Sequence, residues 1–147
     1  MGVIYYGTQI KVAEATFTEA GAGTYTGTIA VPAGSTLIDI QVQSTALWTN
    51  GTSATMVVGD GDDPNGFYDA IDLKATDLLV AEVIRFGSTG GKEGAYIVTA
   101  TGELNSYSAS ARNIIGVVTA GVGAEATGVT RMLVIYATPT AVAATKA

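Results

Sequence analysis

Cysteine and histidine are both absent from this sequence of 147 residues. Without cysteine there can be no disulfide, no thiolate nucleophile and no cysteine metal ligand. Without histidine there can be no Ser-His-Asp or Cys-His arrangement, and the commonest general base at neutral pH is missing. A pair of carboxylates could still act as a glycosidase, with five candidates in one stretch of the chain: Asp60, Asp62, Asp63, Asp69 and Asp72. Because one tryptophan and three phenylalanines are a small supply for an aromatic-lined cleft, we expect no enzyme activity and no cofactor.

Charge is scarce as well. Charged residues make up 14% of the chain, and the net charge is −6. No two of the seven basic residues are adjacent, and no apolar run approaches the roughly eighteen residues of a membrane span. These absences disfavour nucleic acids and membranes as partners. Apolar residue types reach 48%, so much of the surface must be uncharged, which suits contacts between subunits.

The sequence shows no sign of targeting or of a second domain. Its start, MGVIYYGTQIKVAE, has neither a basic region nor the apolar stretch of a secretory signal, and the missing cysteine fits synthesis in the cytosol. No internal repeat or linker divides the chain, and its length fits one domain. We predict a single domain over residues 11–138, with an N-terminal arm or first strand at 1–10 and a small-residue tail at 139–147.

Short runs rich in valine, isoleucine, threonine and tyrosine lie between glycines and prolines, whereas helical periodicity is weak throughout. Eight runs are candidate strands: Val12–Thr18, Tyr25–Val31, Leu37–Val42, Thr55–Val58, Leu79–Phe86, Ala95–Thr99, Ile114–Thr119 and Arg131–Ala137. This pattern predicts an all-β fold, an antiparallel β-sandwich. The eight-stranded jelly roll is the leading topology, and an immunoglobulin-like sandwich is the alternative.

Three local patterns refine this prediction. In TLIDIQVQS the alternation places Ile38, Ile40 and Val42 on one face of a strand, as a half-buried antiparallel strand requires. Asn50-Gly51 favours a type I′ hairpin turn, so the runs on either side of it are expected to pair. Residues 69–79 are the one place where a helical turn or two could form.

The acidic stretch GDGDDPNGFYDAID invites a test for a metal site. Asp60 and Asp62 fit the first two positions of a calcium loop, but Pro64 and Ile71 occupy positions where ligands are diagnostic. Asp60, Asp62 and Asn65 therefore remain weak metal candidates. The favoured interpretation is a strand connection in which Asp and Asn side chains accept hydrogen bonds from nearby backbone amides.

Two groups of residues are candidates for contact with a partner. Val3, Ile4, Tyr5 and Tyr6 form an apolar segment that either adds to a neighbour, at a sheet edge or on another protein's surface, or forms the first strand of the domain itself. Trp48 either touches a partner or caps one end of the core, and the cap is favoured because a lone tryptophan in a small sandwich usually packs.

The segment VPAGSTLIDIQV, the Asn-Gly turn and ATMVVGDGDDPNGFYDAIDL together resemble the small head decoration, or cement, proteins of tailed bacteriophages and related virion structural proteins. The resemblance covers roughly residues 28–86. It implies a compact β-domain, often a homotrimer, that sits on the outside of the virion, binds the major capsid protein and bridges coat subunits. It also implies synthesis in the cytoplasm of a bacterial host, and it brings no catalytic residues.

A second function stays open beside the structural one. A β-sandwich on a phage fibre could recognise glycans of the host surface, with Trp48 and tyrosines stacking on sugar rings. Seven tyrosines spread thinly along the chain do not favour a stacking platform. We therefore expect a structural virion protein, with a glycan-binding fibre module as the alternative.

Overall fold

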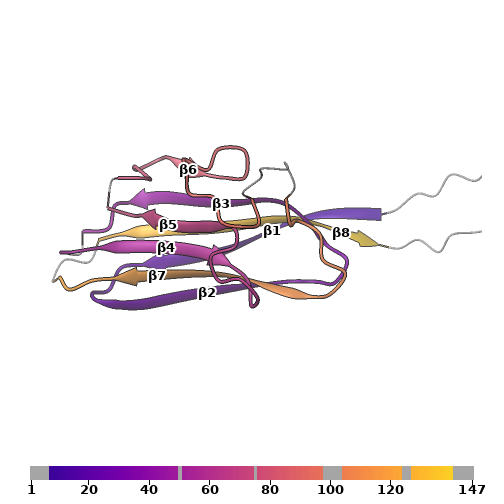
Figure 1. The fold of residues 1–147 in the computed structure, drawn as a ribbon, viewed down its shortest axis with the longest axis horizontal. Helices are drawn as coiled ribbons and strands as arrows, with labels where there is room; N and C mark the ends of the chain where they lie inside the picture. Colours follow the sequence, from indigo (N-terminus) through magenta and orange to yellow (C-terminus); the bar gives the residue numbers. More distant parts are fainter. Residues whose placement is uncertain (1–6, 50, 75, 98–103, 124–126, 141–147) are drawn as a thin grey trace, which may run out of the picture.

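Two antiparallel four-stranded sheets face each other in the computed structural model, which describes residues 7–49, 51–74, 76–97, 104–123 and 127–140 (Figure 1). The first sheet has the order β1-β8-β3-β6 and consists of β1 (Gly7–Thr18), β8 (Val129–Thr140), β3 (Thr36–Ala46) and β6 (Val83–Ile84). The second sheet has the order β2-β7-β4-β5 and consists of β2 (Gly23–Val31), β7 (Arg112–Ala120), β4 (Ala54–Gly59) and β5 (Tyr68–Asp72). The described residues contain no helix that is long and apolar enough to cross a membrane.

The strand order is that of a jelly roll. Six of the seven connections between consecutive strands cross from one sheet to the other, and only β4 and β5 are consecutive within a sheet. This arrangement confirms the predicted all-β sandwich with jelly-roll topology. It differs from the immunoglobulin order, in which the first two strands are neighbours within one sheet, because β1 and β2 lie in different sheets here.

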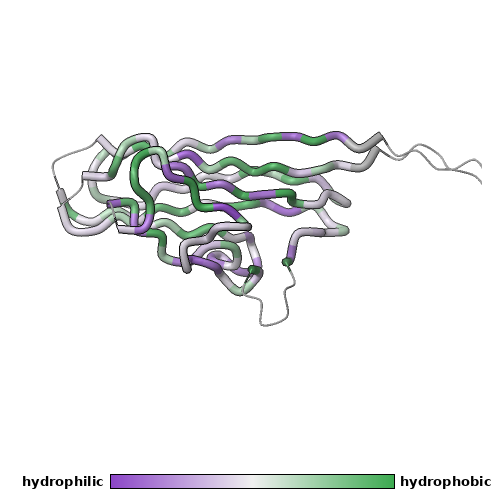
Figure 2. Tube along the Cα trace, turned by 90° about the horizontal axis from the view of Figure 1, so that it is seen from above, coloured by the Kyte–Doolittle hydropathy of each residue, from purple (hydrophilic) through white to green (hydrophobic). Residues whose placement is uncertain are grey.

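Alternating side chains build the core between the sheets, and Figure 2 shows this alternation as green and purple segments along the strands. On β8, Met132, Val134 and Tyr136 are buried and face the second sheet. Gly116 on β7 allows close packing, because a Cβ there would lie 2.9 Å from Met132 Sδ and 2.9 Å from Phe17 Cζ. The bulky side chains of the first sheet therefore interdigitate with β7 at this point.

Three of the predicted elements are wrong or shortened. Leu79–Phe86 forms only the two-residue β6, and residues 95–97 form a turn, while 98 and 99 lie outside the described residues. The expected helical turn at 69–79 is instead β5 followed by turns. The reason lies in β5, where Tyr68 and Ile71 are both buried although they are three positions apart, because three steps along β5 oppose two steps along β4. Ala70, with φ of 48°, forms this β-bulge. The bulge gives the buried residues a spacing of three positions, which in the sequence resembles the spacing along one face of a helix.

The predicted hairpin at Asn50-Gly51 is also wrong, because β3 and β4 lie in different sheets and do not pair. The chain crosses between the sheets here, and Asn50 itself lies outside the described residues. Trp48 explains the crossing: its side chain is buried, and its backbone amide donates to the Leu73 carbonyl. Burial of this indole between the sheets directs the segment across the end of the sandwich.

The alternation of β3 holds except at its start. Ile40 and Val42 are buried as predicted, but Ile38 is 47% exposed and Leu37 is buried in its place. A shift in register between Leu37 and Asp39 against β8 marks a β-bulge. The bulge changes the phase of the alternation by one residue, so Leu37 and Ile40 both face the core.

The first and last described strands extend beyond the bounds predicted for the domain. β1 begins at Gly7, and Gly7 pairs with Thr140 at the end of β8. Figure 1 shows the two strands running side by side to the same end of the molecule. Residues 7–10 and 139–140 are thus strand residues of the sandwich.

Candidate interaction surface

The outer face of the first sheet is apolar at the end where β1 begins and β8 ends. Ile10 pairs with Ala137, Ala137 pairs with Thr36, and a bridge joins Thr36 to Tyr107. Paired residues in an antiparallel sheet point to the same face, so these four side chains form one row. Ile10 is 69% exposed and Tyr107 is 60% exposed.

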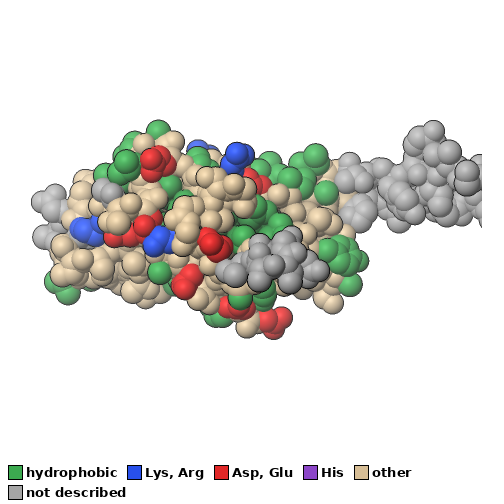
Figure 3. All heavy atoms as spheres, turned by 45° about the horizontal axis from the view of Figure 1, so that its top comes forward, with side chains coloured by type: hydrophobic (Ala, Val, Ile, Leu, Met, Phe, Trp, Pro, Cys, Tyr) green, Lys and Arg blue, Asp and Glu red, His purple; other side chains and the backbone are tan. Residues whose placement is uncertain are grey.

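A second row lies beside the first and is formed by Val12 and Ile135, with Ile38 projecting at the bulge. Val12 is 60% exposed. We call the apolar members of both rows the terminal face: Ile10, Val12, Ile38, Tyr107, Ile135 and Ala137. In Figure 3, green side chains gather towards this end of the molecule. Asp39, which shares the second row, directs its carboxylate to the Phe86 amide at 2.9 Å and the Gln41 amide at 3.0 Å.

The other half of this sheet face is polar, and its side chains bond to one another. Arg131 donates to Glu14 through Nε at 3.0 Å and through a second nitrogen at 2.6 Å. The bond from Arg131, followed by that from Thr16, holds the pKa of Glu14 below its ordinary value. Gln43 donates to Gln41 along β3 at 3.1 Å. These polar groups already bond to one another. The terminal face is therefore the part of this surface whose burial by a partner removes the most apolar area from water.

Strand β1 also has a free edge beside the terminal face. In its sheet it pairs with β8 alone among the described residues. With twelve residues, β1 is long for an edge strand, and its Ile10 and Val12 side chains are exposed. Long apolar edges present unpaired backbone groups to which another extended segment can add.

The acidic stretch forms the connection from β4 to β5, as the favoured interpretation predicts. Asp60 is 6% exposed, and its Oδ1 accepts the backbone amides of Asp62 and Asp63, each at 3.0 Å. The Gly66 amide then donates to the Asp63 carbonyl at 3.1 Å and closes the turn. Asn65 is exposed at the tip. Within the described residues no group of three or more acidic residues is placed to hold a metal ion.

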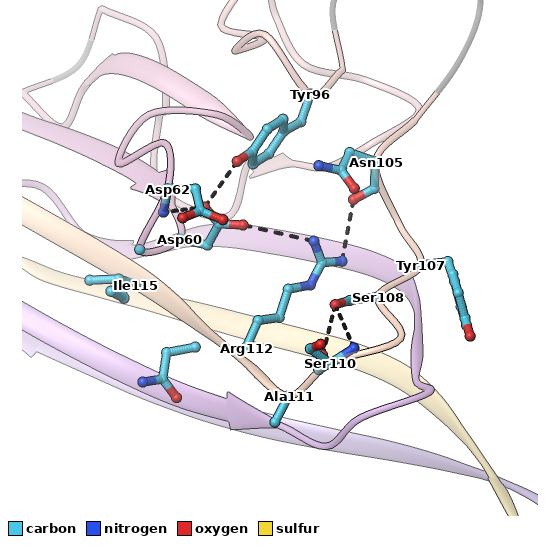
Figure 4. Close-up of a pocket in the computed structure, with 12 residues that line it drawn as sticks. Asp60, Asp62, Tyr96, Asn105, Tyr107, Ser108, Ser110, Ala111, Arg112 and Ile115 are labelled. Atoms are coloured by element: carbon cyan, nitrogen blue, oxygen red, sulfur yellow. Dashed lines mark hydrogen bonds and ion pairs between the residues drawn. The ribbon is translucent and has the colours of Figure 1, made fainter.

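Arg112 at the start of β7 completes a cluster around Asp60 (Figure 4). Its guanidinium lies 3.8 Å from Asp60 Oδ2 and donates to the carbonyls of Asn105 at 3.3 Å and Ser106 at 2.8 Å. It also lies over the Phe67 ring, with 5.6 Å from Cζ to the ring centroid. Burial lowers the pKa of Arg112, and the Asp60 charge counteracts this. Arg112 thus fastens the segment before β7 to the end of β4.

Tyr96 approaches the same carboxylate from the other side. Its hydroxyl donates to Asp60 Oδ1 at 3.0 Å, and its ring meets Phe67 edge-on at 5.1 Å. Burial, and then the bond to Asp60, raises the pKa of Tyr96 to about 12. With both oxygens occupied, Asp60 is poorly placed to act as a general acid or base.

A hollow of about 380 Å³ opens beside this cluster. Its lining is mostly polar: Asp60, Gly61, Asp62, Tyr96, Asn105, Tyr107, Ser108, Ser110, Ala111, Arg112, Asn113 and Ile115. The side chains of Tyr96, Asn105 and Tyr107 surround it in Figure 4. Because Arg112 faces Asp60, the hollow suits neutral polar groups better than a strongly charged ligand.

The residues proposed from the sequence for partner contacts fall in different places. Val3, Ile4, Tyr5 and Tyr6 lie outside the described residues. Trp48 is 2% exposed, donates through Nε1 to Thr130 at 2.9 Å and meets the Tyr25 ring edge-on. Its burial agrees with the favoured cap over one end of the core, and its side chain adds nothing to the surface.

Sequence reasoning did not find the terminal face or the role of Arg112. Arg112 stands before the apolar run NIIGVV, and a lone charge at a strand start indicates no partner 52 positions away at Asp60. Tyr107 lies between predicted strands, and no pattern in the sequence indicated that it belongs to a surface with Ile10. The alternation of Ile10 and Val12 with Lys11 predicts that the two apolar side chains share a face, but it assigns that face to the core, whereas both are exposed.

No protein-family model and no curated protein sequence matches the chain. Solved structures do resemble it in fold. A chain of the cyanophage Pam1 capsid asymmetric unit superposes with a TM-score of 0.54 at 19% identity, covering 93% of this chain and 88% of that chain. A chain of the acid-stable capsid of Helicobacter pylori bacteriophage KHP30 gives 0.54 at 14% identity, covering 94% and 100%. A chain of the capsid of Ralstonia phage GP4 gives 0.52 at 17% identity, covering 93% and 88%.

Proposed function

We propose that this protein is a structural protein of a phage virion that binds the outer surface of the capsid and stabilises it by bridging coat subunits. The observation that carries the proposal is the fold: chains of three phage capsid structures share it over at least 93% of this chain. The sequence resemblance to tailed-phage decoration proteins, drawn from residues 28–86, points independently to the same class.

The surface supports an adhesive role. Most of it is uncharged, since 14% of all residues carry charge. It carries an apolar terminal face next to a free strand edge, and buried apolar anchors ringed by neutral polar groups are what tight protein contacts use. The Asp60 cluster is engaged in hydrogen bonds, and the chain has neither histidine nor cysteine, so we propose a protein without catalytic activity.

We further propose that the protein acts as a homotrimer made in the cytoplasm of a bacterial host and bound to the major capsid protein. The decoration proteins that the sequence resembles are often trimers. The test is to mix the purified protein with expanded capsids of candidate tailed phages and to measure occupancy by cryo-electron microscopy. Native mass spectrometry gives the oligomeric state. Saturable occupancy by trimers is expected, and capsids left bare by a folded protein would contradict the proposal.

The polar hollow favours one second candidate, a glycan-binding module of a phage fibre. Tyr96 and Tyr107 lie there with Asn105 and Asn113, and tyrosine rings beside amide groups suit the faces and hydroxyls of sugars. A glycan array separates the two functions. Binding that Tyr107→Ala abolishes, together with bare capsids, would establish the fibre module in place of the capsid protein.

A further inference from the structure

The terminal face and the free edge of β1 form one surface that suits a small, extended binding segment. The terminal face has six side chains, whereas a stable interface between folded partners uses roughly 20–30 residues on each side. An extended segment that adds to a sheet edge needs far fewer, because its backbone supplies hydrogen bonds while alternate side chains occupy the neighbouring face. The shape of the surface therefore favours a short strand as its occupant.

The chain itself contains such a segment directly before β1. Val3, Ile4, Tyr5 and Tyr6 carry no charge and combine β-branched with aromatic residues, the types that pair well across strands. They precede Gly7, which lies at the same end of the molecule as Ile10. We propose that residues 3–6 of one copy add to the β1 edge of a second copy and cover Ile10 and Val12 of its terminal face. This inference rests on the self-association proposed above.

The direction of β1 argues for a second copy over the same copy. Gly7 and Thr8 are already paired with Thr140 and Pro139, and the chain runs from them towards Ile10. To return to its own β1 edge, the chain would have to reverse immediately before Gly7. A hairpin loop needs at least two residues, so this reversal would consume Tyr5 and Tyr6 and leave them off the face. Addition to a second copy requires no reversal.

Engineered disulfides test the proposal directly, because the chain has no native cysteine. Tyr5→Cys is combined with Ile10→Cys in one protein and with Val12→Cys in another. The two pairs test two neighbouring registers of the added segment against β1. The matched control combines Tyr5→Cys with Val122→Cys, which is 78% exposed in the β7–β8 connection. Each single variant controls for disulfides between identical positions. After mild oxidation, we expect a non-reducing denaturing gel to show covalent dimers and trimers for at least one of the first two pairs and monomer for the control.

Other outcomes overturn the inference. A disulfide formed within one monomer would place the segment on its own copy. An oligomer without interchain disulfides would show that the copies associate through another interface. A chain that stays monomeric in solution overturns it as well. As a second measurement, removal of residues 1–6, which leaves every described strand intact, is expected to weaken self-association at least tenfold in analytical ultracentrifugation, with an unchanged circular-dichroism spectrum. Unchanged association would contradict the inference.

Capsid occupancy separates this inference from the proposed function. Interchain disulfides with bare capsids would leave the segment exchange standing and defeat the capsid role. Occupied capsids without interchain disulfides would do the reverse.

Discussion

At the scale of single residues, buried carboxylates hold the connections between strands. Glu19 is 3% exposed, and its Oε2 accepts the backbone amides of Thr49 at 3.0 Å, Thr127 at 3.2 Å and Gly128 at 2.9 Å. Asp60 does the same for the acidic connection at the other end of the sandwich. Each carboxylate satisfies several backbone amides at once; the Gly128 amide is buried, and a buried amide is costly to leave unpaired.

Glu19→Ala is expected to lower the free energy of unfolding by about 2–4 kcal/mol, because several amides lose their acceptor at once. Glu19→Gln keeps one oxygen acceptor and is expected to cost less. Urea denaturation followed by tryptophan fluorescence measures both. Glu14→Gln is the control, since this carboxylate belongs to an exposed ion pair, and such pairs contribute little to stability. A Glu19→Ala protein as stable as this control would show that the amides find other acceptors.

Tyr96 predicts a loss of stability at alkaline pH. Burial raises its pKa in the folded protein to about 12, above the ordinary value of 10.0. Between these values the unfolded chain has released the proton while the folded chain retains it, so the stabilisation present below pH 10 is lost as the pH rises towards 12. Burial also raises the pKa of Tyr68, which contributes equally in the wild type and in a Tyr96→Phe variant.

The measurement is the unfolding free energy of both proteins from pH 9 to pH 12. The wild type is expected to lose stability more steeply than Tyr96→Phe over this range. Parallel curves would mean that the Tyr96 hydroxyl titrates in the folded protein as it does in the unfolded chain.

At the scale of elements, bulges decide which side chains reach the core. The bulge in β3 exchanges the roles of Leu37 and Ile38, and the bulge at Ala70 brings Tyr68 and Ile71 to the same side of β5. Tyr68 is fully buried, and its hydroxyl donates to the Ile40 carbonyl of the facing sheet. Both irregularities therefore serve packing between the two sheets, which outweighs strict alternation within a strand.

The β3 bulge is tested by a matched pair of substitutions. Leu37→Ala is expected to cost about 2–5 kcal/mol, as for other truncations of a buried leucine. Ile38→Ala removes an exposed side chain and is expected to change stability by no more than about 0.5 kcal/mol. Guanidinium denaturation of the two variants gives the comparison. If Ile38→Ala proves the more damaging of the two, the strand has the unbroken alternation that its sequence suggests.

At the scale of the whole molecule, the jelly roll joins segments far apart in the chain. β1 pairs along its full length with β8, and β2 pairs with β7. Trp48 bonds to Thr130 of the first sheet and contacts Tyr25 of the second. With one core between the sheets, neither sheet has an apolar face that can be satisfied without the other.

We therefore expect a single cooperative unfolding transition. Fluorescence of Trp48, the one tryptophan in the sequence, and far-ultraviolet circular dichroism should give the same midpoint. Refolding should take on the order of milliseconds to seconds, because most strand pairs close long loops. Two separate midpoints would show that one sheet can persist without the other.

Local chemistry made several features predictable. The Asx-type turn at Asp60 needs only the spacing of Asp, Gly and Pro, and the burial of Ile40 and Val42 needs only alternation. The turn after Val31 behaves likewise, since Gly34 adopts the positive φ of 76° that glycine permits. The other features depended on distant residues. Asn50-Gly51 fits a hairpin turn, yet the buried Trp48 carries the chain to the other sheet.

The sequence by itself determined that the protein is an all-β sandwich without histidine or cysteine chemistry, because periodicity, turn residues and composition act within a few neighbouring positions. Only the tertiary structure decided which strands are neighbours, that Arg112 meets Asp60, and that Ile10, Val12, Ile38 and Tyr107 share one face. These contacts join segments that are far apart in the sequence. They follow from the way two sheets bury a common core, and no local pattern encodes that arrangement.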